Sequence, residues 1–244
     1  MMETLVFETK HSYCYKENYI FRKYIKYNDS FIVNREYLYA KIAYDNGIKT
    51  PKPINKGYSN IKNLMYIEYE WADLIRISEF VITDKIFNDI FKLSEKIKII
   101  EGIKSDDFWV KNRLPEMILK IKVANNILKE KDDIDLVYLQ NLKPVCFIHG
   151  DYSESNICLN RTDDLYITDF ENACMGPNRW DICYFLASYY SNKEIPEFIK
   201  SYLSDEDLRL IKIIAKIRYG RAITKNIDHT LRLEAIYRWN KFIL

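Results

Sequence analysis

The sequence predicts an α+β protein in which a strand-rich N-terminal part precedes a mainly helical remainder. Residues 1–71 alternate short β-prone runs with one helical segment, whereas helical periodicity dominates residues 72–244. A length of 244 residues suits one large domain or two lobes that share a cleft, and the change of pattern near residue 72 favours two lobes. We therefore expect an N-terminal lobe at 1–71, with a small antiparallel sheet plus one helix, and a helical C-terminal lobe at 72–244.

The N-terminal elements follow from turn residues that separate apolar runs. The predicted strands are 5–9, 13–16, 19–25, 54–58 and 64–69. Between the third and fourth strands, a helix begins near Asp29 or Ser30, either of which can cap its N-terminus. The same helix ends at Gly47, because glycine readily adopts the left-handed conformation that closes helices.

The C-terminal part is predicted from apolar positions at helical spacing. The predicted helices are 86–100, 115–129, 206–223 and 231–242. Strand-like runs at 145–148, 157–160 and 165–168 interrupt them. Polar residues concentrate around these three runs, which makes the segment the best candidate for a functional site.

Composition argues against several classes of function. The chain has 37 Lys and Arg against 35 Asp and Glu, a formal net charge of +2, so we expect no nucleic-acid partner. Its five cysteines are scattered without a C-x-x-C pair and are expected to be reduced. The N-terminus lacks the basic start and apolar stretch of a signal peptide, and no run approaches the ~18–20 apolar residues of a membrane span. We expect a cytoplasmic protein without stable membrane insertion; the oligomeric state is not predicted.

Three oxygen-bearing side chains are predicted to gather at one end of a hairpin. If the turn between 157–160 and 165–168 is centred between Thr162 and Asp163, Asn156 lies opposite Asp169. An amide oxygen beside a carboxylate suits Mg²⁺, which prefers oxygen ligands. Asp151, five residues before Asn156, can return toward the same end, orient an attacking hydroxyl and accept its proton.

The same residues carry a family resemblance. The run His149-Gly150-Asp151 with Asn156, followed by Ile167-Thr168-Asp169-Phe170-Glu171, resembles the paired motifs of the aminoglycoside phosphotransferase and choline kinase family. The continuation at 173–185 is similar to the bacterial choline kinase branch in particular. The resemblance covers about residues 5–190 and implies a bilobal protein-kinase-like fold.

The resemblance also implies roles for individual residues. Asp151 would be the catalytic base, and Asn156 and Asp169 would be the Mg²⁺ ligands. His149 and Asp181 would brace the catalytic loop. For Glu171, a second metal ligand and a packing or solvated role remain equal alternatives.

The N-terminal half fits the same family scheme. Arg22 occupies the position where the family has a cation over the ATP phosphates, and Glu36 matches the helix glutamate that pairs with that cation. Independently, Glu36 lies on the apolar stripe of its own helix, where an unpaired carboxylate is costly, so a cation is expected beside it. Lys23 is the alternative to Arg22, because a shift of one residue exchanges their faces. The run Glu68-Tyr69-Glu70 would be the hinge whose backbone contacts adenine.

Together these features predict an ATP- and Mg²⁺-dependent kinase that phosphorylates a hydroxyl of a small molecule, either an amino alcohol such as choline or ethanolamine, or an amino sugar or aminoglycoside. Two departures from the family pattern bear on this. The run Lys10-His11-Ser12 has no glycine where many kinases have a Gly-rich loop, and Ser188 stands where choline kinases tend to have a glutamate.

Two functional alternatives to this interpretation remain, and one set of aromatic residues can be interpreted in two ways. The protein could be a non-catalytic nucleotide-binding relative, or a hydrolase that pairs Asp169 with Asp151 or Glu171. Aromatic residues could form a cage for a quaternary ammonium or simply pack in the core; they are Trp180, Tyr184, Phe185, Tyr189, Tyr190, Tyr237 and Trp239.

Overall fold

The computed structural model describes residues 3–27, 29–101, 103, 107–128, 134–191 and 194–225. The helix predicted at 231–242, with Tyr237 and Trp239, lies outside these residues. The chain divides into two compact units. Unit 1 comprises Met1–Phe80, Ile99–Ile103 and Ser155–Ala173, and unit 2 comprises Val81–Lys98, Lys104–Glu154 and Cys174–Leu244.

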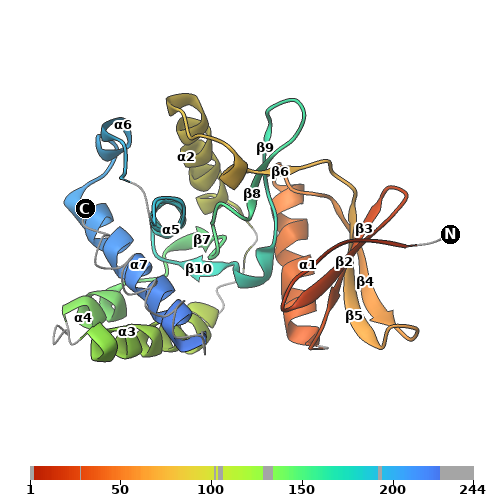
Figure 1. Cartoon of the computed structure of the whole chain (residues 1–244), viewed down its shortest axis with the longest axis horizontal. Helices are drawn as coiled ribbons and strands as arrows, with labels where there is room; N and C mark the ends of the chain where they lie inside the picture. Colours follow the sequence, from red (N-terminus) through yellow and green to blue (C-terminus); the bar gives the residue numbers. More distant parts are fainter. Residues whose placement is uncertain are drawn as a thin grey trace. The chain divides into compact units, whose positions relative to one another are not determined.

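Unit 1 is built on a five-stranded antiparallel sheet with the strand order β1-β2-β3-β5-β4 (Figure 1). The strands are β1 (Thr4–Glu8), β2 (Ser12–Glu17), β3 (Ile20–Ile25), β4 (Pro53–Ser59) and β5 (Leu64–Glu70). Strand β5 is hydrogen-bonded on both sides, and its Ile67 is fully buried. All five predicted strands are therefore present, with ends that differ by at most one residue.

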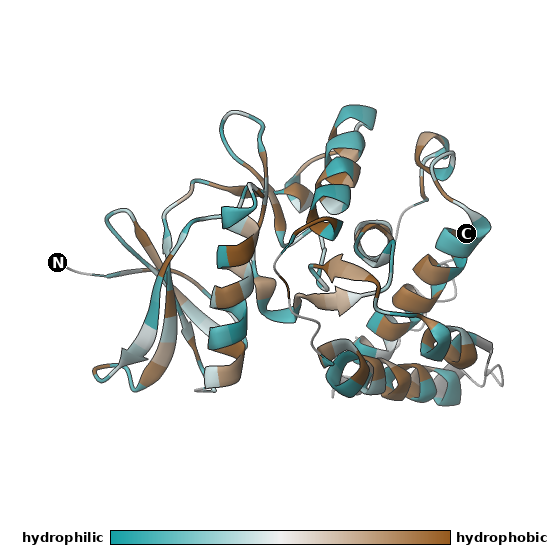
Figure 2. Ribbon diagram, turned by 180° about the vertical axis from the view of Figure 1, so that it is seen from behind, coloured by the Kyte–Doolittle hydropathy of each residue, from teal (hydrophilic) through white to brown (hydrophobic). Residues whose placement is uncertain are grey.

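Helix α1 (Ser30–Asp45) packs against this sheet. The carboxylate of Asp29 accepts hydrogen bonds from the backbone N–H groups of Phe31 and Ile32, so Asp29 rather than Ser30 caps the helix. Gly47 follows with a φ of 77°, as expected for a residue that closes a helix. Along α1, hydrophobic and hydrophilic residues recur in bands, which is the pattern of a helix with one buried face (Figure 2).

A second, three-stranded sheet completes unit 1 with the order β6-β8-β9. Its strands are β6 (Ile75–Arg76), β8 (Ile157–Leu159) and β9 (Leu165–Ile167), and a 3₁₀ turn, η3 (Phe170–Asn172), follows. The backbone N–H of Ile167 donates to the carbonyl of Lys49, and the guanidinium of Arg35 on α1 donates to the carbonyl of Ala173. Because of these bonds, residues 155–173 pack with the N-terminal sheet although they come late in the chain.

Unit 2 is mainly helical around a two-stranded antiparallel sheet of β7 (Cys146–Ile148) and β10 (Cys174–Gly176). The helices are α2 (Asp84–Lys98), α3 (Leu114–Leu128), α4 (Ile134–Asn141), α5 (Trp180–Tyr189), α6 (Glu197–Lys200) and α7 (Asp205–Lys225), preceded at α3 by the π-helical turn η2 (Trp109–Arg113). Every residue of α5 is buried, and α7 packs against both α3 and α5. Helix α5 is therefore the centre of the unit 2 core.

The α+β fold class is confirmed: a small antiparallel sheet with one helix precedes a mainly helical part. The helices predicted at 86–100, 115–129 and 206–223 correspond to α2, α3 and α7 within two residues at each end. In the part of the chain described here, no helix has both the length and the apolar character needed to cross a bilayer.

Candidate active site

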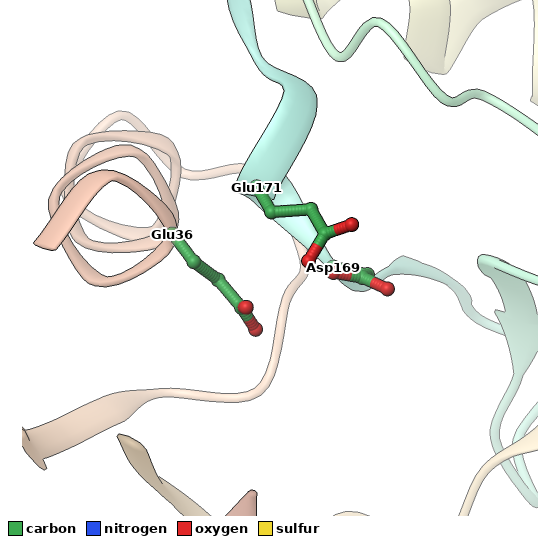
Figure 3. Close-up of side chains that lie close together, drawn as sticks. All are labelled: Glu36, Asp169 and Glu171. Carbon is green, nitrogen blue, oxygen red and sulfur yellow. The ribbon is translucent and has the colours of Figure 1, made fainter. Parts of the chain in front are cut away.

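The centre of unit 1 holds a buried cation among three carboxylates. The ammonium of Lys23 on β3 lies 2.9 Å from Glu36, 3.0 Å from Asp169 and 3.8 Å from Glu171. Figure 3 shows Glu36 on its helix and Asp169 and Glu171 on the segment of η3, with their carboxylates directed toward a common region. Oxygen atoms of the three acids lie within 4.8 Å of one another. Lys23 contacts all three acids but offsets only one of their negative charges, so the cluster keeps an excess of negative charge.

The alternation of strand β3 decides which basic residue enters this cluster. Arg22 lies opposite Glu68 in the β3–β5 ladder and donates to Glu68 and Glu3. Successive side chains of a strand point to opposite faces, so Lys23 faces α1 when Arg22 faces away. The predicted pairing of Arg22 with Glu36 is therefore wrong. The alternative, Lys23, is the partner of Glu36.

The pKa values reflect this arrangement. Burial lowers the pKa of Lys23, but the carboxylates of Asp169, Glu36 and Glu171 outweigh it and hold that pKa well above its ordinary value. Burial raises the pKa of Glu36, and Lys23 together with the Tyr69 hydroxyl, which donates over 2.8 Å, opposes that rise. Glu36 is 1% exposed, so it depends on these two partners for its charge.

Asn156 and Asp169 lie at the ends of adjacent strands, one residue out of the predicted register. In the β8–β9 ladder Ile157 pairs with Ile167, and the N–H of Thr168 donates to the carbonyl of Asn156 over 2.9 Å. Asn156 is therefore opposite Thr168 rather than Asp169.

The register differs because the hairpin turn is centred on Thr162. The side chain of Asn160 accepts from the N–H groups of Thr162 and Asp164, and Asp163 takes up the extra residue with a φ of 59°. Strand β9 ends at Ile167, and two residues later Asp169 has a φ of 68°, which changes the direction of the backbone there. An amide oxygen and a carboxylate from adjacent strand ends fit the oxygen ligands that Mg²⁺ prefers.

The three residues expected to form the adenine hinge lie instead inside strand β5. Glu68 and Tyr69 pair with residues of both β3 and β4, and the N–H of Glu70 donates to the carbonyl of Lys52. Their backbone groups therefore take part in the sheet. The side chains also have structural partners, since Glu68 accepts from Arg22 and Tyr69 donates to Glu36.

In unit 2, Asp181 anchors the loop that carries Asp151. The two carboxylate oxygens of Asp181 accept the backbone N–H groups of His149 over 2.7 Å and of Gly150 over 3.0 Å. His149 is fully buried, and its Nδ1 accepts the N–H of Asp151 over 3.4 Å. Burial raises the pKa of Asp181, and His149 with the two backbone donors opposes that rise. Asp181 and His149 thus hold the backbone on both sides of Gly150.

Two arginines and a tyrosine in unit 2 surround Asp151. Arg113 donates to the carbonyl of Gly150 over 3.0 Å, which ties η2 to the loop. Burial and the Asp151 carboxylate raise the pKa of Tyr184 to about 12. Burial lowers the pKa of Arg218, but Tyr184, Glu154 and Asp151 outweigh it and raise that pKa. Neither arginine was predicted as a site residue.

A pocket in unit 2 adjoins these residues and has a volume of about 370 Å³. It is lined by Arg113, Met117, Lys120, Trp180, Tyr184, Ile214, Ile217, Arg218, Arg221 and Ala222. This volume is at the lower end of the range typical of small-molecule sites.

The antiparallel sheet with its buried Lys–Glu pair, and the helical part with its braced Asp151 loop, are features of a protein-kinase-like fold. Comparisons agree with this fold. Residues 109–211 match the model of a family described as the phosphotransferase enzyme family. A curated relative, the protein LicA homolog of Metamycoplasma hominis, is 26% identical over 153 residues. The alignment covers 59% of this chain and spans 59% of the length of that relative.

Solved structures share the fold. The GDP complex of a mutant aminoglycoside 2'-phosphotransferase-IIIa superposes with a TM-score of 0.69 at 14% identity, covering 98% of this chain and 90% of that one. A choline/ethanolamine kinase family protein from Mesorhizobium loti gives 0.67 at 12% identity, covering 99% and 86%. LicA in complex with AMP gives 0.61 at 13% identity, covering 100% and 92%. The predicted resemblance to the aminoglycoside phosphotransferase and choline kinase family is confirmed.

Proposed function

We propose that the protein is an ATP- and Mg²⁺-dependent kinase that transfers the γ-phosphoryl group to a hydroxyl of a small molecule. The observation that carries this proposal is the buried Lys23–Glu36 ion pair with Asp169 at 3.0 Å from the same ammonium. A kinase needs such a lysine to hold phosphates and such an aspartate to hold the metal. In this proposal Lys23 takes the phosphate-binding role that the sequence suggested for Arg22.

The remaining roles follow from the residues at hand. Asn156 and Asp169 would hold Mg²⁺, which when bound neutralises charge on the transferring phosphates. Asp151 orients the acceptor hydroxyl and takes its proton. As the acceptor oxygen bonds to the γ-phosphorus, the bond from that phosphorus to the β–γ bridging oxygen breaks, and ADP leaves. Because the backbone of Glu68-Tyr69-Glu70 takes part in the sheet, we assign the adenine contact in this proposal to the chain that follows β5.

The family resemblance makes amino alcohols such as choline or ethanolamine, and amino sugars or aminoglycosides, the first acceptor hypothesis. The names of similar structures support it, since one is a complex with GDP and kanamycin and another is a choline/ethanolamine kinase family protein. GDP, AMP and AMP-PNP in the titles of such structures support a nucleotide donor.

The test is ADP release with MgATP across a panel of small alcohols, for wild type and for Asp151→Asn. We expect the substitution to lower the rate at least about 100-fold, the lower range for loss of a general base. Asp163→Asn is the matched control, because Asp163 is exposed on the hairpin turn and asparagine tolerates its φ of 59°. Equal rates for wild type and Asp151→Asn would contradict the assignment of Asp151 as the catalytic base.

One observation favours the non-catalytic alternative. The β1–β2 turn is closed by side chains instead of glycine, since the hydroxyl of Thr9 accepts the N–H groups of His11 and Ser12. A turn built in this way offers fewer free backbone donors for phosphates. This alternative predicts that MgATP raises the thermal midpoint without any ADP release, an outcome that the same panel detects.

A further inference from the structure

The pocket of unit 2 is lined by four cationic side chains. They are Arg113, Lys120, Arg218 and Arg221, and none of its described lining residues is acidic. Lys120 and Arg113 are largely buried, with side chains 14% and 15% exposed. So many cations around one small volume are expected only where negative charge is bound or lies close by.

Three carboxylates of the described residues lie near these four cations. Glu116 lies 2.5 Å from Lys120 and 3.9 Å from Arg113, and Asp151 and Glu154 interact electrostatically with Arg218. Burial lowers the pKa of Lys120, and the neighbouring Arg221 and Arg113 lower it further. The cations of the pocket therefore repel one another, and an anion placed among them would relieve that repulsion.

The aromatic side chains of the pocket do not form an open cage for an ammonium group. The guanidinium of Arg218 lies 5.2 Å from the centre of the Tyr184 ring, so this ring already has a cation over its face. Trp180 is 1% exposed, and its indole N–H has no acceptor among the described residues. A buried donor of this kind calls for an acceptor oxygen from a ligand.

The pocket also adjoins the proposed catalytic base. Arg113 donates to the carbonyl of Gly150, the residue before Asp151. Tyr184 lines the pocket and makes a side-chain hydrogen bond with Asp151. A molecule in the pocket would lie against two residues that contact the Asp151 loop, which makes the pocket the candidate acceptor site of the proposed kinase.

We propose that the acceptor is a small alcohol that carries an acidic group, a carboxylate or a phosphate. This inference rests on the proposed function and replaces the cationic amino alcohols and amino sugars as the preferred substrate class. The acidic group lies among Lys120, Arg221 and the indole N–H of Trp180. The hydroxyl points toward Asp151.

The test uses the full chain and four sugars of one ring size: glucosamine, glucose, glucuronate and glucose 6-phosphate. Calorimetric binding without nucleotide is measured separately from ADP release with MgATP. We expect glucuronate, glucose 6-phosphate or both to bind at least about tenfold tighter than glucose, and glucosamine to bind weaker than glucose. Comparison of the two anions separates a carboxylate site from a phosphate site.

Substitutions then test whether the preference for anionic sugars arises in the pocket. Arg221→Glu is expected to reduce the ratio of anionic to glucosamine affinity at least about tenfold, whereas Arg221→Lys keeps that ratio. Lys212→Glu is the matched control, because Lys212 is exposed on the same helix and does not line the pocket. An unchanged ratio in Arg221→Glu contradicts the inference.

The outcomes separate this inference from the kinase proposal. Anion binding without ADP release supports the charge preference of the pocket but contradicts its role as the acceptor site of a kinase. ADP release that favours glucosamine, kanamycin or choline supports the kinase and overturns the inference. Equal or absent binding of all four sugars overturns the inference as well.

Discussion

Replacing Lys23 by methionine is expected to remove both stability and ADP release. The Lys23 ammonium is 2.9 Å from Glu36, and at an effective dielectric constant of about 20 this separation corresponds to an attraction of about 6 kcal/mol before desolvation is subtracted. Methionine keeps the length of the side chain but leaves Glu36, at 1% exposure, buried without its cation. Removing one member of a buried ion pair costs about 3–5 kcal/mol, so we expect a loss of that size in the free energy of unfolding.

Arg22→Met is the matched control for this variant. Arg22 is the neighbouring residue on the same strand, and its side chain is 19% exposed with Glu68 and Glu3 as partners. We expect it to lose about 1–2 kcal/mol and to retain ADP release, because its contacts are structural. Urea unfolding and ADP release are measured for both variants. The reasoning is refuted if Arg22→Met abolishes ADP release while Lys23→Met retains it.

The pH dependence of Lys23→Met gives a second, independent measurement. Burial already raises the pKa of Glu36 above its ordinary value of 4.5, and loss of Lys23 removes a contribution that lowers it. When the pKa of a carboxyl is higher in the folded state than in the unfolded state, the group does not destabilise the fold at a pH below its unfolded-state pKa. The free energy of unfolding decreases as pH rises through the folded-state pKa. The destabilisation relative to wild type should therefore shrink as pH falls toward 4.5. A difference that stays constant with pH would contradict the role of Glu36.

Two further predictions concern unit 2 and the thiols. Gly220→Ala is expected to destabilise the protein by about 1–3 kcal/mol, because an added Cβ would clash with the backbone carbonyl of Lys120 where α7 crosses α3. Thermal unfolding measures this, and an unchanged midpoint would show that the two helices are not in close contact. The five free cysteines should react slowly with a thiol reagent at pH 8, because burial raises the pKa of Cys14, Cys146 and Cys158 to about 11. All five should react after unfolding, and rapid reaction of two or more in the native protein would contradict the burial.

The secondary structure of the described region was largely predictable, whereas two side-chain pairings were not. Strands and helices follow from periodicity and turn residues, which are local properties of the chain. The partner of Glu36 depends on which face of β3 meets α1, and a shift of one residue exchanges Arg22 and Lys23. Which residue lies opposite Asn156 depends on the number of residues in the hairpin turn. The turn contains one more residue than expected on the Asp163 side, where Asp163 has a left-handed backbone conformation. Both errors are therefore errors of register.

The pocket was not predictable for a different reason. Its cations come from η2 and α3 on one side and from α7 on the other, which lie about one hundred residues apart in the chain, and no motif spans such a distance. Trp180 and Tyr184 were noted only as members of an aromatic set, for which a cage and a packed core were both considered. Their whole helix is buried, and the face of Tyr184 is occupied by Arg218. The structure thus brings basic and aromatic residues that are distant in the sequence into one pocket.

The acidic and basic residues of this protein differ in how far sequence can identify them. The residues that motifs identified are acids and amides: Glu36, Asp151, Asn156, Asp169 and Asp181. The basic residues nearest to the acids, namely Lys23, Arg113 and Arg218, come from other strands and helices. A catalytic carboxylate must stand at a fixed place in its loop, while a compensating cation can approach from any element that packs nearby. Motif recognition therefore led to the proposal of phosphoryl transfer, whereas the proposed charge preference for the acceptor rests on the cations that packing brings around the pocket.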